Sequence, residues 1–497
     1  MKLKNSKKNI LFISIALLLS IVIIVSIKFN SIKDSIDFAY NFCVDNFGWI
    51  FVISDIISLI FSIWIIFGPC KNIVLGGEDS KPTYSNLSWL GMLFTSSCGA
   101  WLVVYGFLES IYCSSGIPFD SGATSFEYGQ MYAKYHWGPS IWCIYVPATI
   151  AIGYLIFNKK EKNANLSSVF SLSNRKGAFY NKILLPLIDI LSVCSKVLAP
   201  VISVGVGMPL LVVLAKNFIN IDDKTLQIII LLLWIIFFGI SVYFGINKGV
   251  KKVSDINVYL YFAFAIFIGA LVGFKDVINS EINSIGLLLN NYIRISTFTN
   301  PFKTADFING WTLSYYACYF VYMPFMGVFN AKISKGRKLK DIAIGQLLVC
   351  PLGCWIAMAT FGNYSIMLQN KGVLDVSSFL VNGNEAGAII NIINTMPYSK
   401  ILMVVLFFVC FIFLATTMNS GITAAAEATS ENSSEENYSP KWLRMVWIFI
   451  ASIICFILIQ FESVKSIRSL CYIAGLPFAI ISIFIVVIIV KTLLSNK

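Results

Sequence analysis

Residues 310–337 read GWTLSYYACYFVYMPFMGVFNAKISKGR, and this stretch decides the fold. Its first part is aromatic, uncharged and about 20 residues long, which is the length that a helix needs to cross a bilayer. Basic residues follow directly, at Lys332, Lys335, Arg337 and Lys338. An apolar helix that stops at clustered basic residues predicts a membrane span whose far end faces the cytoplasm.

The composition of the whole chain agrees with a polytopic membrane protein. Hydrophobic residues make up 57% of the 497 positions and charged residues 12%, about half the charged fraction of an ordinary soluble protein. The net charge of +12 comes from Lys and Arg in short loops beside apolar runs, so it indicates membrane orientation rather than nucleic-acid binding. A single histidine, His136, leaves no basis for a multi-histidine metal centre or a Ser-His-Asp triad. We predict no metal and no cofactor.

The apolar runs predict an all-α integral membrane fold with about twelve transmembrane helices. They cover residues 10–27, 49–67, 90–112, 139–157, 190–215, 226–246, 256–274, 310–330, 342–367, 401–421, 446–459 and 473–490. Loops after even-numbered spans are the basic ones, which places both termini in the cytoplasm and the protein in the plasma membrane.

Two interruptions suggest how the spans are arranged. The third span contains the small polar run 95–100, TSSCGA, and the eighth contains Pro324 and Gly327. Interrupted helices at corresponding positions of two halves are typical of transporters built from inverted repeats. The predicted domains are 1–86 with two additional helices, 87–276 as the first repeat of five spans, 277–309 as an external amphipathic helix and connection, and 310–497 as the second repeat of five.

The turn 331–337, AKISKGR, resembles the signature of the betaine/carnitine/choline transporter family, in which a Trp-rich span leads into an Ala-Arg-Ile-Ser-Arg-Gly-Arg-like turn. The resemblance implies a five-plus-five inverted repeat of the LeuT-like kind. It also implies a secondary transporter of small zwitterionic quaternary-ammonium compounds. Members of the family are often trimeric, so a homotrimer is one possible assembly, and membrane lipid is the other expected partner.

A quaternary ammonium group has no N–H to donate, so aromatic faces bind it through cation–π attraction. Residues 136–142, HWGPSIW, resemble the carnitine-antiporter branch, where both tryptophans line the substrate pocket. The same resemblance implies a pocket tyrosine at the end of the third span and aromatic pocket residues in the eighth, where Tyr315 begins the aromatic run. The implied aromatic substrate residues are Tyr112, Trp137, Trp142, Tyr316, Tyr319 and Tyr322.

The chain also departs from the family pattern. Cys318 stands where the family uses a tryptophan as a wall of its aromatic box. In the third span only Gly99 remains of a Gly-x-Gly-x-Gly pattern, flanked by Ser97 and Trp101. We assign these four positions to the substrate site as well. Either Trp101 refills the space at Cys318, or the pocket suits a small N-methylated or plain amino acid such as sarcosine, dimethylglycine or glycine.

The coupling ion is suggested by four residues. Thr416 and Thr417 match hydroxyls that bind sodium in sodium-driven members of the family. Lys251 matches a fixed arginine, and Met326 a methionine, that replace sodium in the sodium-independent branch. A permanent cation beside the hydroxyls disfavours a second one, so we expect sodium-independent exchange or facilitated transport. A desolvated lysine can lose its proton, which keeps proton coupling open, and sodium coupling remains part of the alternative.

Glu109 is the one carboxylate in the third span, and we predict a structural or gating role for it.

The sequence can be compared with three classes of membrane protein other than transporters. A channel needs a continuous polar pore, and an enzyme needs a nucleophile with its base or a metal cluster, and the sequence indicates neither. A membrane sensor without transport activity remains an alternative, because a fold does not dictate a function.

Overall fold

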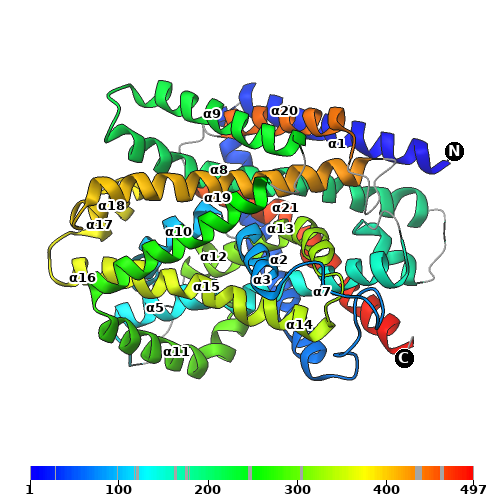
Figure 1. The fold of residues 1–497 in the computed structure, drawn as a ribbon, viewed down its shortest axis with the longest axis horizontal. Coiled ribbons are helices and arrows are strands. Elements are labelled where there is room, and N and C mark those ends of the chain that lie inside the picture. The colour runs from blue at the N-terminus through cyan, green and yellow to red at the C-terminus, as the bar shows by residue number, and fades with distance from the viewer. Residues whose placement is uncertain are drawn as a thin grey trace.

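The structure is a computed structural model that describes residues 2–27, 29–97, 99–116, 118, 122–161, 165–173, 177, 180–244, 249–302, 306–430, 439–458 and 464–495. Throughout these ranges the chain is built from helices, most of which run along the long axis of the molecule (Figure 1). The one β-type contact given for these residues is a single antiparallel bridge between Val74 and Lys338. Both ends of the chain lie at the same end of the bundle (Figure 1).

The first half of the chain forms α1 (Lys2–Ile27), α2 (Phe29–Phe67), α3 (Asn86–Ser97), α4 (Ala100–Ser114), α5 (Ser125–His136), α6 (Pro139–Trp142), α7 (Tyr145–Gly153), the short helices η1 (Tyr154–Asn158), η2 (Ser167–Ser173) and η3 (Tyr180–Leu184), then α8 (Leu185–Lys216), α9 (Asp223–Phe244) and α10 (Gly249–Val272). The second half forms α11 (Phe274–Thr297), α12 (Asp306–Gly310), α13 (Thr312–Ile333), α14 (Leu339–Ile344), η4 (Gly345–Val349), α15 (Cys350–Ala357), η5 (Met358–Gly362), α16 (Asn363–Asn370), α17 (Val376–Val381), α18 (Glu385–Asn394), α19 (Ser399–Thr429), α20 (Lys441–Leu458) and α21 (Val464–Ser495).

The predicted all-helical membrane architecture is confirmed. Among the described residues, eight helices are long and apolar enough to cross a membrane, or nine if the bent pair α3–α4 counts as one span. The predicted spans 10–27, 310–330 and 446–459 coincide with α1, α13 and α20, which are not among those nine. The total of twelve spans therefore stays a prediction.

The third predicted span is broken where its polar run predicts a break. α3 ends at Ser97, α4 begins at Ala100, and the two axes differ by 71°. Gly99 precedes α4 with φ −88° and ψ −161°, an extended conformation that the helix cannot continue. No side chain caps the start of α4. The first amides of α4 are therefore left for other partners.

The predicted interruption at Pro324 and Gly327 in the eighth span is wrong, because α13 runs unbroken from Thr312 to Ile333. Three residues before Pro324, the carbonyl oxygen of Val321 also accepts a hydrogen bond from the Ser195 hydroxyl of α8. Gly327 allows close packing instead of a break. A Cβ at this position would lie 2.7 Å from the Cβ of Ala148 on α7.

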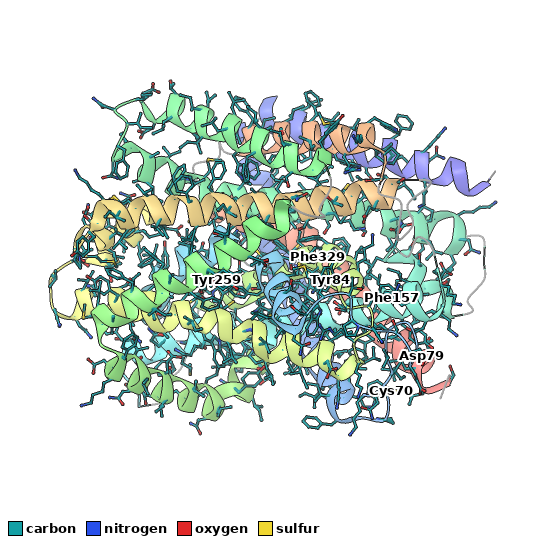
Figure 2. The ribbon with its side chains drawn as sticks, viewed as in Figure 1. Cys70, Asp79, Tyr84, Phe157, Tyr259 and Phe329 are labelled. Atoms are coloured by element: carbon teal, nitrogen blue, oxygen red, sulfur yellow. The ribbon has the colours of Figure 1, made fainter. Side chains whose placement is uncertain are left out.

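The AKISKGR turn joins two loops at one end of the bundle. Gly336 N donates to Leu75 O at 2.8 Å, and Leu75 N donates to Arg337 O at 3.0 Å. The Arg337 guanidinium donates to Tyr84 O at 2.6 Å and lies 4.5 Å from the centre of the Trp89 ring. Tyr84 lies in this region together with Cys70, Asp79 and Phe157 (Figure 2). This turn therefore holds the loop between α2 and α3 in place.

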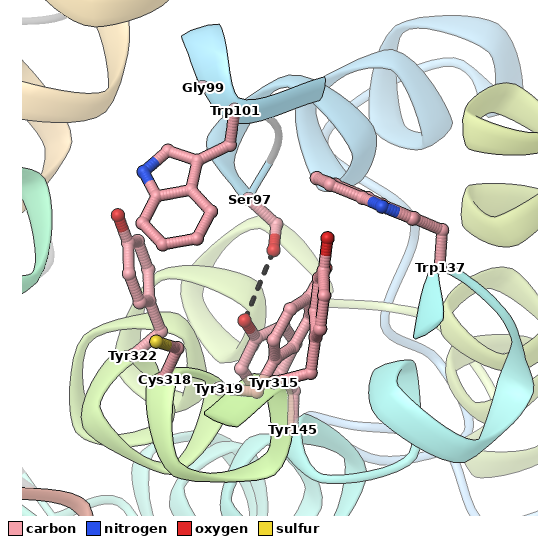
Figure 3. Close-up of a pocket in the computed structure, with 9 residues that line it drawn as sticks. All are labelled: Ser97, Gly99, Trp101, Trp137, Tyr145, Tyr315, Cys318, Tyr319 and Tyr322. Atoms are coloured by element: carbon pink, nitrogen blue, oxygen red, sulfur yellow. Dashed lines mark hydrogen bonds between the residues drawn. The ribbon is translucent and has the colours of Figure 1, made fainter. Parts of the chain in front are cut away.

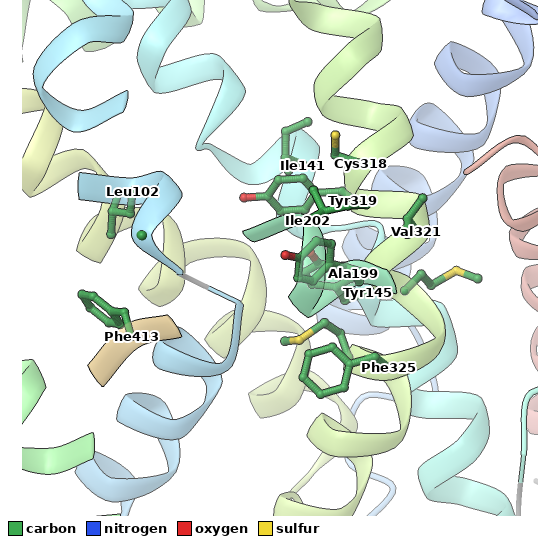
Figure 4. Close-up of a cluster of buried hydrophobic side chains, with 14 of the residues drawn as sticks. Leu102, Ile141, Tyr145, Ala199, Ile202, Cys318, Tyr319, Val321, Phe325 and Phe413 are labelled. Atoms are coloured by element: carbon green, nitrogen blue, oxygen red, sulfur yellow. The ribbon is translucent and has the colours of Figure 1, made fainter. Parts of the chain in front are cut away.

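The core is continuous through the middle of the bundle. α8 packs along α19 and α2 along α21, while α13 contacts α7, α8 and α21. Buried side chains from α4, α8, α13 and α19 meet beside the break after α3, among them Leu102, Ile202, Phe325 and Phe413 (Figure 4). This packing fixes α13 relative to the broken span.

The region 277–309, predicted as an external amphipathic helix, contains most of α11. Ser284, Leu288 and Ile295 are buried on the side of α11 that packs against α5. Ile282 and Ile293 on other sides are 68% and 78% exposed. A helix that is apolar on an outer face suits a lipid interface or contact with another protein.

Candidate functional site

A small cavity lies between the broken span and α13 (Figure 3). Its walls come from α3 and α4, the residue after α5, α7, and one face of α13. The lining residues are Ser97, Gly99, Trp101, Trp137, Tyr145, Tyr315, Cys318, Tyr319 and Tyr322. Six of the nine are aromatic and none is charged.

The α13 wall follows from helical geometry. Tyr315, Cys318, Tyr319 and Tyr322 are spaced three or four residues apart, so they share one face of the helix. Figure 3 shows the Trp101 ring on the side of the cavity where Cys318 and Tyr322 lie.

Contacts at the cavity connect the end of α3 to α7 and α13. The Ser97 hydroxyl donates to the Tyr145 hydroxyl at 3.2 Å (Figure 3). The Tyr145 ring stacks on Tyr319 with centroids 5.4 Å apart and planes at 18°. The last residue of α3 is thereby connected through α7 to α13.

Seven of the ten residues predicted for the substrate site line this cavity: Ser97, Gly99, Trp101, Trp137, Cys318, Tyr319 and Tyr322. Tyr145 was not singled out from the sequence, and Tyr315 was noted only as part of the aromatic run. Tyr315 could have been selected by its helical spacing from Tyr319 and Tyr322. Tyr145 follows the turn between α6 and α7, whose geometry the sequence does not specify.

The other three predicted residues lie outside the lining. Trp142 is fully buried behind it, with its ring edge-on to Tyr319 at 6.4 Å. The Tyr112 hydroxyl donates to Glu385 Oε1 at 2.8 Å. The Tyr316 hydroxyl lies 2.5 Å from that of Tyr135, on a different face of α13 from the cavity.

Glu109 forms the centre of a buried network beside the cavity. Its Oε1 lies 2.7 Å from His136 Nδ1, and its Oε2 accepts from Trp137 Nε1 at 2.7 Å and from the Tyr315 hydroxyl. Because an ionised carboxylate only accepts hydrogen bonds, His136 Nδ1 must carry the proton. His136 Nε2 lies 3.0 Å from Thr312 Oγ1. Glu109 therefore holds two of the cavity's aromatic walls.

Glu109, Cys113 and His136 also place one potential metal-ligand atom each within 4.8 Å of one another. Three such donors are compatible with a zinc-like ion. In this arrangement both Glu109 oxygens already accept hydrogen bonds, and His136 is bonded at both ring nitrogens. The hydrogen-bonded network accounts for these groups without an ion.

Of the four residues predicted to decide ion coupling, Thr417 lies close to the break. Thr416 and Thr417 on α19 both donate to Phe413 O, at 3.0 and 2.9 Å. A Cβ at Gly99 would lie 3.8 Å from Thr417 Oγ1, so this threonine is close to the broken span. Met326 is fully buried in α13. Lys251 belongs to the first turn of α10, and its side chain lies outside the described part of the structure.

Comparisons with known proteins give two distant structural likenesses and one family match. Among solved structures, a Na⁺-coupled sialic acid symporter in a substrate-bound outward-open state is similar with a TM-score of 0.48 and 14% identity, over 89% of this chain and 85% of that one. MhsT in complex with L-phenylalanine is similar with a TM-score of 0.45 and 12% identity, over 80% and 88%. These likenesses are too distant to transfer a function. A family model described as betaine/carnitine/choline family transporter matches residues 9–497, nearly the whole chain. The chain therefore belongs to the betaine/carnitine/choline transporter family.

Proposed function

We propose that this secondary transporter carries small zwitterionic quaternary-ammonium compounds of the betaine or carnitine type by alternating access. The observation that carries the proposal is the lining of the cavity, with six aromatic side chains and no charged one. Such a lining attracts a methylated cation through ring faces, at about 0.5 to 2 kcal/mol for each contact. It offers no buried charge that would need a partner when the site is empty.

The carboxylate of such a substrate also has a plausible partner. The uncapped start of α4 leaves its first amides without side-chain acceptors. A helix N-terminus carries a partial positive charge that favours an anion. Ser97 and Gly99 place this helix end at the wall of the cavity, opposite the aromatic face of α13. A zwitterion would thus have a different surface for each of its charges.

Transport is proposed to be sodium-independent, by exchange or facilitated movement. The support is the resemblance at Lys251 and Met326 to the branch that replaces sodium with protein groups. Burial of Met326 is compatible with a packed thioether in place of an ion. We further propose that the protein resides in the plasma membrane with both termini cytoplasmic, as the basic loops indicate.

A second candidate substrate is a small N-methylated or plain amino acid, and protons or sodium are the coupling ions considered for it. The observation in its favour is Cys318, which gives the α13 wall a small side chain among tyrosines. A primary or secondary amine can donate hydrogen bonds to tyrosine hydroxyls, which a quaternary ammonium cannot. Trp101 favours the first candidate, because its indole lies on the Cys318 side of the cavity (Figure 3).

The test is substrate counterflow in proteoliposomes with labelled glycine betaine, carnitine and sarcosine, with potassium replacing sodium in half of the samples. Saturable exchange of betaine or carnitine that ignores sodium is the expected result. Preference for sarcosine would select the second candidate, and exchange that appears only with sodium would contradict the coupling assignment. Absence of exchange in folded protein, for all three labels, would refute the substrate class.

Trp101→Ala tests the cation–π argument on the same assay. Loss of one contact of about 0.5 to 2 kcal/mol corresponds to a half-saturation concentration about 2- to 30-fold higher. Trp442→Ala is the matched control, because Trp442 lies on α20 with 61% of its surface exposed. Equal half-saturation concentrations in the two variants would show that the Trp101 ring does not contact the substrate.

A further inference from the structure

Asp55 is a buried carboxyl in the interior of the bundle. It lies in the middle of α2 and is 1% exposed. Its Oδ1 accepts from the Cys143 thiol at 3.4 Å, whereas its Oδ2 has no hydrogen-bond partner. A buried carboxylate with a bare oxygen is costly unless it is neutralised.

The groups around Asp55 do not supply a positive charge. The titratable side chains that interact with it are Cys143 after α6, Tyr135 on α5, Tyr292 on α11 and Tyr316 on α13. α21 brings Ala479 and Ser482 to this part of α2, bonded to Ser54 and Ser58.

The two basic residues beside Tyr135 are engaged elsewhere. Lys134 pairs with Glu281 at 2.7 Å, and His136 pairs with Glu109. Within the described ranges, Asp55 forms no ion pair with a Lys, Arg or His.

A chain of hydroxyls connects this carboxyl to the end of α11. The Tyr135 hydroxyl donates to Ser296 Oγ at 3.1 Å, and it lies 2.5 Å from the Tyr316 hydroxyl. A tyrosine has a single hydroxyl proton, so Tyr316 donates to Tyr135 in this arrangement. Tyr316 also interacts with the Asp55 carboxyl, and a hydroxyl beside a carboxyl can either donate or accept a hydrogen bond.

We propose that Asp55 is a proton-binding site of the transport cycle, reached from the predicted outer side through the hydroxyl chain of Ser296, Tyr135 and Tyr316. Ser296 is the penultimate residue of α11, and the next residue, Thr297, is exposed. Tyr316 belongs to α13, and a different face of this helix lines the cavity. Gain or loss of the proton therefore acts on the helix that carries most of the aromatic wall.

Only the role of Asp55 in the transport cycle rests on the proposed function; binding of a proton at Asp55 does not. Two measurements therefore test proton binding and the transport role separately. Infrared titration of the full-length protein in lipid detects a protonated carboxyl directly and needs no substrate. We expect a protonated-carboxyl band that persists above the usual pH range of an aspartate and is lost in Asp55→Asn. Asp45→Asn, an exposed aspartate on the same helix, is the control and should retain the band.

Counterflow at varied outer pH tests the role in the cycle. Exchange by the unmodified protein should depend on outer pH, Asp55→Asn should lose that dependence, and Asp45→Asn should keep it. Tyr135→Phe removes the bridging hydroxyl and should also abolish the response to outer pH while retaining the infrared band.

Three results would overturn the proposal. The first is an infrared band that is absent or that survives in Asp55→Asn. The second is a band that disappears on addition of sodium or potassium, which would make Asp55 a metal-cation site. The third is unaltered pH dependence of exchange in Asp55→Asn. If no label exchanges at all, the proposed substrate class fails, while the infrared titration still decides whether Asp55 binds a proton.

Discussion

Replacement of Glu109 should separate the effect of its hydrogen bonds from the effect of its charge. Three donors point at this carboxylate, from His136, Trp137 and Tyr315, and all of these groups are buried. Glu109→Ala removes every acceptor at once. Glu109→Gln keeps the shape and one oxygen, so the pair of variants forms a graded test.

The two variants should lose different amounts of stability, because Glu109→Ala leaves the buried donors without an acceptor and Glu109→Gln does not. Each donor left unsatisfied costs about 1 to 3 kcal/mol, so Glu109→Ala should cost about 3 to 9 kcal/mol. In Glu109→Gln the amide oxygen can accept from Trp137 and Tyr315 while the amide nitrogen faces His136. Neutral His136 can change tautomer, accept at Nδ1 and donate from Nε2 to Thr312 Oγ1. Only the charge assistance is lost, at about 1 to 2 kcal/mol.

The assay is the apparent melting temperature in detergent, followed by size-exclusion chromatography after heating. We expect Glu109→Gln to melt slightly below the unmodified protein and Glu109→Ala far below both. Glu78→Ala, in the exposed part of the α2–α3 loop, is the control and should melt with the unmodified protein. Equal melting of Glu109→Ala and the unmodified protein would refute the network. If Glu109→Gln melts as low as Glu109→Ala, the tautomer argument is wrong.

Two glycine substitutions test the packing that positions α13 and the turn at residues 331–337. Gly475→Ala would place a Cβ 2.4 Å from the carbonyl oxygen of Ala317. This contact forces α21 and α13 apart at a cost of about 1 to 3 kcal/mol. In the control, Gly91→Ala, the added Cβ meets nothing within 4 Å, so this variant should not lower the melting temperature. Gly336→Ala combines φ +74° with a backbone contact of 2.3 Å in the α2–α3 loop, so it should sharply reduce the yield of folded protein, whereas Gly177→Ala, in open space, should not. Normal melting of Gly475→Ala, or normal yield of Gly336→Ala, would show that the close approach at that glycine is not required.

The fold could be predicted from the sequence where a local pattern has only one physical solution. Long apolar runs must be helices in a bilayer, because lipid offers no hydrogen bonds to the backbone. The small polar run at residues 95–100 correctly indicated the break between α3 and α4. Pro324 and Gly327 gave the same kind of signal, but α13 continues through both positions. Gly327 allows α7 to approach α13 closely. A sequence pattern alone does not distinguish these two uses.

The candidate site shows a similar limit. The wall that α13 contributes can be predicted from the sequence, because Tyr315, Tyr319 and Tyr322 are spaced so that they lie on one face of a helix. Tyr316 is offset from that face, and its hydroxyl is directed to Tyr135 instead. The resemblance to a family motif does not report this difference, because the motif groups neighbours in sequence that point to different sides of the helix. Tyr145 depends on the turn after α6 and has no comparable signal.

The two buried carboxyls beside α13, Glu109 and Asp55, differ in the hydrogen bonds that they accept. Glu109 accepts from three donors and lies against the chain's single histidine. Asp55 accepts from the Cys143 thiol, and among the described residues its Oδ2 has no hydrogen-bond partner. Tyr315 binds the first carboxylate and Tyr316 contacts the second, although they are adjacent in sequence. α13 therefore contacts the Glu109 carboxyl, with its three donors, through Tyr315 and the Asp55 carboxyl through Tyr316, so the proton exchange proposed for Asp55 changes the charge beside only the second of these contacts.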